Sequence, residues 1–125
     1  MTSPAPLTMN IMLSIATADS NGNTGDGKYN YVFSPGLIIA IASPVTVTIQ
    51  LTKDTLARFV IEDLVSTDSK FQLGAPRIDT NGRSMSIDNQ NSQRCLIFMS
   101  VLVRDTVNGY LLNCDPQMTN VPEGG

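Results

Sequence analysis

Residues 45–51 read Val-Thr-Val-Thr-Ile-Gln-Leu, and this stretch decides the fold class. Its apolar residues alternate with threonine and glutamine, so one face of an extended strand would be buried while the other meets water. Strand patterns also occur on both sides of it, over residues 8–17, 29–33, 37–42 and 57–64. We therefore expect an all-β chain, because no segment shows a convincing amphipathic helical period.

An Asn-Gly pair at residues 81–82 predicts the first of two hairpins, between residues 77–80 and 83–87. Asn and Gly tolerate the positive φ angles that both central positions of a type I′ turn require. This turn would place Ile78 opposite Met85, so that the two apolar side chains share one face of the sheet.

A second Asn-Gly pair, at residues 108–109, predicts another hairpin in the last third of the chain. A two-residue turn here would set Val103 opposite Cys114. In that register Cys95 lies far along the strand from Cys114, beyond the reach of a disulfide bond. We expect both cysteines to behave as small apolar residues, with no metal site between them.

About eight short strands separated by frequent turns are typical of a β-sandwich or a barrel. The chain has 125 residues, which is the usual length of one domain. We expect a single β-sandwich domain over residues 1–125, with loose tails at residues 1–7 and 117–125.

Charge is sparse, with 8 basic and 11 acidic residues and a formal net charge of −3. Nucleic acids and anionic membranes bind several cations on one face, whereas the basic residues here occur singly, so we expect neither partner. No apolar run approaches the roughly 20 residues of a membrane span. The first basic residue is Lys28, which favours a cytoplasmic location, with secretion as the open alternative.

The chain contains no histidine, the residue that most often serves as a general base or a metal ligand. Ser-His-Asp and Cys-His arrangements are therefore ruled out as catalytic groups. No glycine-rich phosphate loop and no nucleophile elbow occurs in the sequence. We expect a non-enzymatic protein with no catalytic residue and no cofactor.

Residues 19–27 form a loop that resembles the opening of a calcium-binding loop. The candidate oxygen donors are Asp19, Asn21, Asn23 and Asp26. Thr24 occupies the place of the usual glycine, and Asn30 that of the bidentate glutamate. This mismatch favours an ordinary solvated loop rich in turn-forming residues.

Two further segments could bind a partner. Tyr29 and Tyr31 lie two residues apart and could stack on a carbohydrate ligand, although a row that continues to Phe33 more often belongs to a core. Residues 96–103 are apolar on both faces of the expected strand, and the second face carries Leu96, Phe98 and Leu102. Such a strand is covered twice or takes part in self-association.

An apolar strand from Cys95 to Val103 is followed by Gly-Tyr-Leu-Leu-Asn-Cys-Asp-Pro-Gln at residues 109–117 and by Asn-Val-Pro at 120–122. This segment resembles the closing hairpin of the small bacterial DP-EP proteins, and more remotely the end of the inclusion-body matrix proteins. The family's closing Glu-Pro stands here as Pro-Glu at residues 122–123. The resemblance implies an immunoglobulin-like antiparallel β-sandwich of bacterial origin without an assigned activity, and it carries over no site residue.

The favoured function is a structural or protein-interaction module that forms a homo-oligomer. A calcium- or carbohydrate-binding module is the first alternative, with an unknown small-molecule ligand. A phage or surface-appendage component is the second alternative, because such proteins share this type of fold. Fold alone does not separate these functions, since sandwiches serve many unrelated ones.

Overall fold

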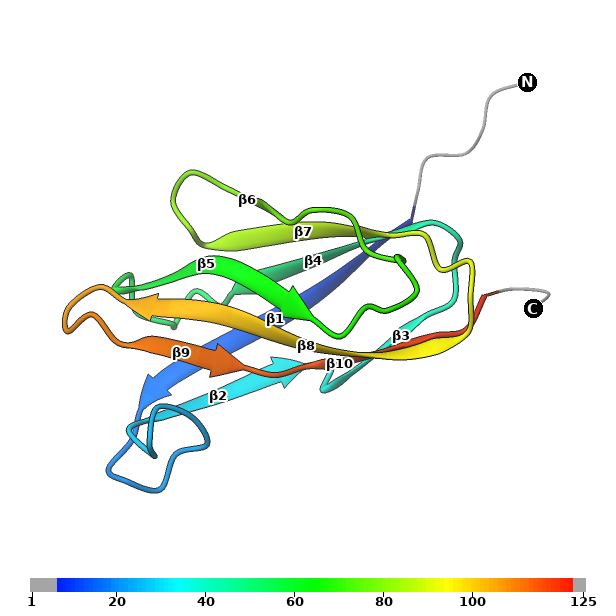
Figure 1. Cartoon of the computed structure of the whole chain (residues 1–125). Coiled ribbons are helices and arrows are strands. Elements are labelled where there is room, and N and C mark those ends of the chain that lie inside the picture. The colour runs from blue at the N-terminus through cyan, green and yellow to red at the C-terminus, as the bar shows by residue number, and fades with distance from the viewer. Residues whose placement is uncertain (1–6, 123–125) are drawn as a thin grey trace.

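The computed structural model describes residues 7–122, and over these residues the chain forms ten β-strands (Figure 1). The first sheet contains β1 (Leu7–Thr17), β2 (Tyr29–Ser34), β4 (Val45–Leu51), β6 (Arg77–Ile78) and β7 (Ser84–Asn89). The second sheet contains β3 (Leu37–Ala40), β5 (Phe59–Ser66), β8 (Cys95–Asp105), β9 (Leu111–Cys114) and β10 (Gln117–Asn120). The expected all-β architecture with two sheets is confirmed.

Both sheets are mixed, so the expectation of purely antiparallel sheets is wrong. The first has the strand order β2-β1-β4-β7-β6, and the second has the order β3-β10-β8-β5 with β9 beside the far half of β8. The pairs β1–β4 and β3–β10 are parallel, and the other pairs are antiparallel. The parallel β1–β4 pair arises because the chain crosses to the second sheet after β2 and returns in the original direction.

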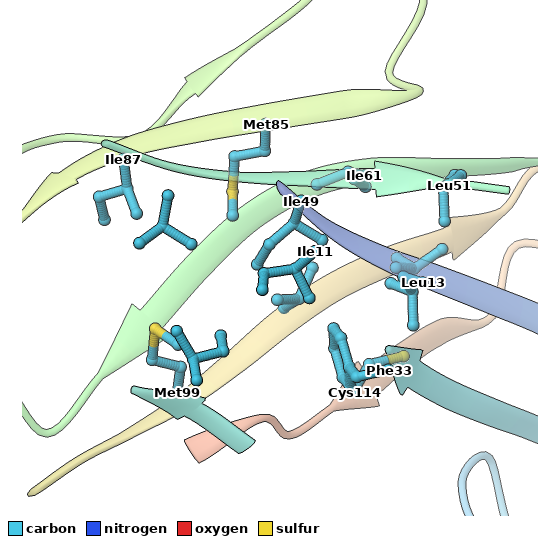
Figure 2. Close-up of a cluster of buried hydrophobic side chains, with 14 of the residues drawn as sticks. Ile11, Leu13, Phe33, Ile49, Leu51, Ile61, Met85, Ile87, Met99 and Cys114 are labelled. Atoms are coloured by element: carbon cyan, nitrogen blue, oxygen red, sulfur yellow. The ribbon is translucent and has the colours of Figure 1, made fainter. Parts of the chain in front are cut away.

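The core lies between the two sheets, as the alternation in residues 45–51 predicts. Every second residue of β4 is buried, from Val45 to Leu51. Figure 2 shows Ile11, Leu13 and Met85 of the first sheet on one side of this layer and Met99 and Cys114 of the second sheet on the other. Each large apolar side chain buried in this way contributes about 1.5–3 kcal/mol to the free energy of unfolding.

The first hairpin has the predicted register but a different turn. Ile78 lies opposite Met85, as expected. Gly82 has a φ of 72°, whereas Asn81 is not among the residues with positive φ, so the turn is not of type I′. The carbonyl of Asp79 accepts the Gly82 N–H at 3.1 Å, and the Asp79 carboxylate accepts two further backbone N–H groups of the turn. These bonds stabilise a turn that is centred one residue earlier than the predicted Asn81-Gly82 turn.

The second hairpin is shifted by two residues from the prediction. Val103 lies opposite Leu112 instead of Cys114. The Asp105 N–H donates to the Tyr110 carbonyl at 2.8 Å, so the loop is longer than the two-residue turn that we expected. A shift of two residues keeps each side chain on its face of the sheet. Both cysteines are free, as the sequence predicts.

The expected loose tail at residues 117–125 is wrong for its first part, because residues 117–120 form β10. β9 and β10 lie end to end along β8 (Figure 1) and keep one register, with Cys114 opposite Val101 and Gln117 opposite Phe98. Pro116 has no N–H to donate, yet its carbonyl accepts the Met99 N–H at 3.2 Å. At the other end, Leu7 belongs to β1, and residues 1–6 and 123–125 lie outside the described part.

Candidate interaction surface

Five apolar side chains gather on the outer face of the second sheet, and we call this set the apolar face. Its members are each about half exposed: Leu37, Ile39, Val65, Leu96 and Phe98. They come from β3, β8 and β5, and β10 lies between β3 and β8 in the sheet order.

Two rows of paired residues cross the apolar face. One row contains Leu37, Gln117 and Phe98. The other contains Ile39, Thr119 and Leu96. Neither row carries a charged side chain, and paired residues of neighbouring strands point to the same side of a sheet. The result is an uncharged, largely apolar surface across three strands.

Two of the three residues predicted for self-association lie on this surface. Leu96 is 49% exposed and Phe98 is 48% exposed. They point outward because their neighbours Ile97 and Met99 point into the core. Leu102 is only half-buried and lies between Asn113 and Asp63 of the adjacent strands, where polar residues resume. It therefore marks the margin of the face.

Sequence reasoning missed the contribution of β5, and it did not show which face of β3 is exposed. Residues 37–42 form a continuous apolar run, which predicts a strand that is apolar on both faces. In the structure Ile38 and Ala40 are buried, whereas Leu37 and Ile39 point outward. A run that is apolar on both faces contains no signal that tells which face is covered. The register of β3 against β10 decides this, because Ile38 lies opposite the buried Met118.

A shallow depression of about 380 Å³ opens on the apolar face near the β9–β10 junction. The outward-facing residues that line it are Val65, Thr67, Phe98, Ser100, Asp115 and Gln117. A single carboxylate at its rim, with hydroxyl and amide groups around it, does not form a catalytic pair or a metal site. Its surface is suited to contact with another apolar surface.

The two predicted ligand-stacking tyrosines do not present a shared surface to solvent. Tyr29 is 2% exposed, and its ring meets that of Phe59 edge-on at 5.9 Å between centroids. Tyr31 is half-buried, and its hydroxyl accepts the Asp115 N–H at 3.2 Å. A sugar ring cannot reach a buried tyrosine face, so the carbohydrate hypothesis has no support in this geometry.

The hydroxyl of Tyr29 belongs to a buried polar network around Asp105. It donates to the Asp105 carboxylate at 2.6 Å, and Arg58 donates to the same carboxylate from Nε at 2.8 Å and from Nη2 at 2.6 Å. The Arg58 guanidinium holds the pKa of the Asp105 carboxyl well below its usual range, although burial opposes this shift. Burial and the nearby carboxylate raise the pKa of Tyr29. The network joins β2, β8 and the segment before β5.

The predicted calcium loop packs against the edge of β2. The Asn23 side chain donates from Nδ2 to the Tyr31 carbonyl at 2.9 Å, and its Oδ1 accepts the Tyr31 N–H at 2.8 Å. Asp19, Asn21 and Asp26 are exposed. Among the described residues, no group of three or more acidic or cysteine side chains could hold a metal ion. With Asn23 committed to backbone bonds, the geometry gives the loop a structural role.

The comparisons with known proteins add no relative: no family model matches the chain, and no curated protein gives a significant match. The resemblance to the DP-EP proteins rests on the residues quoted above. Within residues 7–122 there is no helix with the length and apolarity that a membrane crossing needs. The apolar face is thus the feature from which a function can be argued.

Proposed function

We propose that this chain is a non-enzymatic, immunoglobulin-like β-sandwich that acts as a structural or interaction module by binding further copies of itself. The observation that carries the proposal is the exposure of Leu96 and Phe98, at 49% and 48%, within two rows that carry no charged side chain. Each half-exposed side chain of this size that becomes buried on association contributes about 1 kcal/mol. Clustered exposed apolar residues often mark interaction sites.

Two features support the immunoglobulin-like part of the proposal. The chain forms two sheets that enclose one core, and the segment after β2 crosses from the first sheet to the second. Sandwiches of this class share such an architecture without sharing sequence. The resemblance of residues 95–122 to the DP-EP proteins points in the same direction.

Size-exclusion chromatography with light scattering, over a wide range of protein concentration, tests the proposed self-association. We expect the chain to elute as a dimer or larger species. Phe98→Glu places a charge in the apolar face and should shift the population to monomer, because a buried unpaired charge costs several kcal/mol.

Val107→Glu is the matched control, since Val107 is 70% exposed in the loop between β8 and β9. Thermal unfolding of both variants checks that each is folded. A wild-type chain that remains monomeric at high concentration would contradict the proposal. So would a Phe98→Glu variant that associates as strongly as Val107→Glu.

A further inference from the structure

The edges of the two sheets differ in how they are protected. An edge strand presents unpaired N–H and C=O groups that can pair with another chain, and proteins usually block such edges with loops, charges or bulges. In this sandwich the edges are formed by β2 and β6 of the first sheet and by β3, β5 and β9 of the second.

The edges of β2 and β9 are covered by the loop of residues 19–28. Asn23 occupies both backbone groups of Tyr31, and Thr24 pairs with Tyr29 at the start of β2. The Thr24 hydroxyl also donates to the Asn113 carbonyl of β9 at 2.8 Å. One loop therefore blocks neighbouring edges of both sheets.

The edges on the opposite side are short or charged. β6 contains two residues, and its Arg77 pairs with Asp88 at 2.9 Å. β5 has an irregularity of register between Ile61 and Asp63, where Glu62 pairs with Arg104 at 2.9 Å. Charges and bulges of this kind discourage strand addition.

Among residues 7–122, none of these protections is present at the edge of β3. β3 pairs only with β10, and its residues 37–40 contain no charge and no proline. The Ala40 carbonyl accepts the Val121 N–H at 2.8 Å, so Ala40 points its backbone groups towards β10. Successive residues of a strand point these groups to opposite edges, so the N–H and C=O of Ile39 point to the open side. Within residues 7–122 no hydrogen bond outside the ladder reaches them.

We propose that β3 pairs in antiparallel orientation with β3 of a second copy of this chain. This inference rests on the proposed self-association and adds a strand-edge contact to it. Two identical strands that pair antiparallel around a two-fold axis are self-complementary, which suits the commonest symmetry of protein dimers. The outward groups of Ile39 in one copy then bond with those of Ile39 in the other. The second sheets join into one, with the two apolar faces on the same side.

The contact is small. In the joined sheet the two apolar faces lie side by side and do not cover each other, so of their members only Leu37 and Ile39 of β3 lie beside the second copy. Each exposes on the order of 100 Å², so the apolar contact is at most on the order of 200 Å² per copy, which is below the usual size of a specific interface. Strand pairing adds backbone hydrogen bonds, each of modest net strength. We therefore expect a dimer that dissociates on dilution.

A second stretch of unpaired strand edge lies in the first half of β1. Residues 7–11 pair with β4 on one side only, because β2 pairs with β1 from Met12 onward. Together with β3 they line a depression of about 280 Å³. This stretch belongs to the first sheet, so pairing through it would not join the apolar faces.

Substitution of Ile39 tests the pairing. Ile39→Pro removes the outward N–H but no bond to β10, and proline is tolerated at such edge positions. Ile39→Thr is the matched control, because it shortens the apolar side chain but keeps the N–H and the β-branch. We expect Ile39→Pro to raise the dimer dissociation constant by at least about tenfold, and Ile39→Thr only a few fold. The same melting temperature in both variants shows that the fold is kept.

Cysteine cross-linking tests the register independently. In a Cys95→Ser background, Ile39→Cys should give a disulfide-linked dimer on mild oxidation, since directly opposite residues in an antiparallel pair have Cα atoms about 5.5 Å apart. Thr8→Cys, in the half of β1 that pairs only with β4, should give no disulfide-linked dimer. Cross-linking at Thr8 and not at Ile39 would assign the contact to β1 and overturn the inference.

The two proposals fail in different ways. If Ile39→Pro dimerises like the wild type while Phe98→Glu does not, the apolar face associates without the β3 edge and only the inference is lost. If Ile39→Pro is monomeric while Phe98→Glu dimerises normally, the edge pairs and the face is dispensable. A wild-type chain that is monomeric at every concentration would contradict both the proposed self-association and the pairing through β3.

Discussion

At the scale of single residues, Asp105 shows how the fold accommodates a charge at its centre. The carboxylate is completely buried, yet it accepts hydrogen bonds from Arg58, Tyr29 and the Val107 N–H. A buried charge is tolerated only when its partners replace the lost water. Its neighbours come from segments far apart in the chain, so the sequence alone could not predict this site.

Asp105→Asn should destabilise the fold by about 3 kcal/mol, because it leaves Arg58 without its carboxylate. The folded pKa of Asp105 lies below the value of about 3.9 for an unfolded chain. Its stabilising contribution is therefore complete above about pH 5 and is lost as the pH falls through the acid range. Thermal unfolding across pH should show a weaker acid dependence in the variant than in the wild type.

Asp88→Asn is the control for this substitution. Asp88 pairs with Arg77 on the surface, where both side chains are more than half exposed. Loss of this ion pair should lower the free energy of unfolding by at most about 1 kcal/mol. Equal melting temperatures for the two variants would show that the Asp105 network contributes no more than a surface ion pair.

At the scale of elements, most strands and the two hairpin pairings were predictable, whereas the pairings of strands remote in the sequence were not. The alternation in residues 45–51 is local, and it matches the burial of β4 residue by residue. The turn at Asn81-Gly82 was predicted one residue too late, because the Asp79 carboxylate selects another conformation. β10 was missed because proline usually ends a strand, whereas Pro116 only interrupts the hydrogen bonds to β8.

Glycine substitutions test the turn geometry of the two hairpins. Gly82 has a φ of 72°, and a Cβ at this position would lie 2.8 Å from Cβ of Val60. Gly109 has a φ of 83° with no atom within 4 Å of an added Cβ. Gly109→Ala should lower the free energy of unfolding by about 1–2 kcal/mol, because its backbone has a positive φ. Gly82→Ala should lower it clearly more, because β5 must also move to make room for the added Cβ. Urea unfolding at equilibrium measures both values, and a smaller loss for Gly82→Ala would contradict this geometry.

At the scale of the whole molecule, the edges of the two sheets are unevenly protected against pairing with another chain. The loop of residues 19–28 blocks one pair of edges, and charges blunt β5 and β6. At the end formed by β3, β10 and the first half of β8, the described part of the chain supplies neither a covering loop nor a charged pair at the open edge. Leu96 and Phe98 could be predicted as part of the candidate site, because β8 is apolar on both faces. The edge position of β3 depends on its pairing with β10, which is remote in sequence and which no local pattern reveals.

Association through such a surface should depend on salt and temperature in a characteristic way. The apolar rows contain no charge, and each copy carries a net charge of −3, so the electrostatic interaction between copies is a weak repulsion. Added sodium chloride screens this repulsion and should leave dimerisation unchanged or slightly stronger. Because apolar burial is weaker in the cold, cooling should shift the population towards monomer. Sedimentation velocity at low and high salt, and at two temperatures, measures both effects. A dimer that dissociates in high salt would instead point to ion pairs between the copies, and the contact would then lie away from β3 and the apolar face.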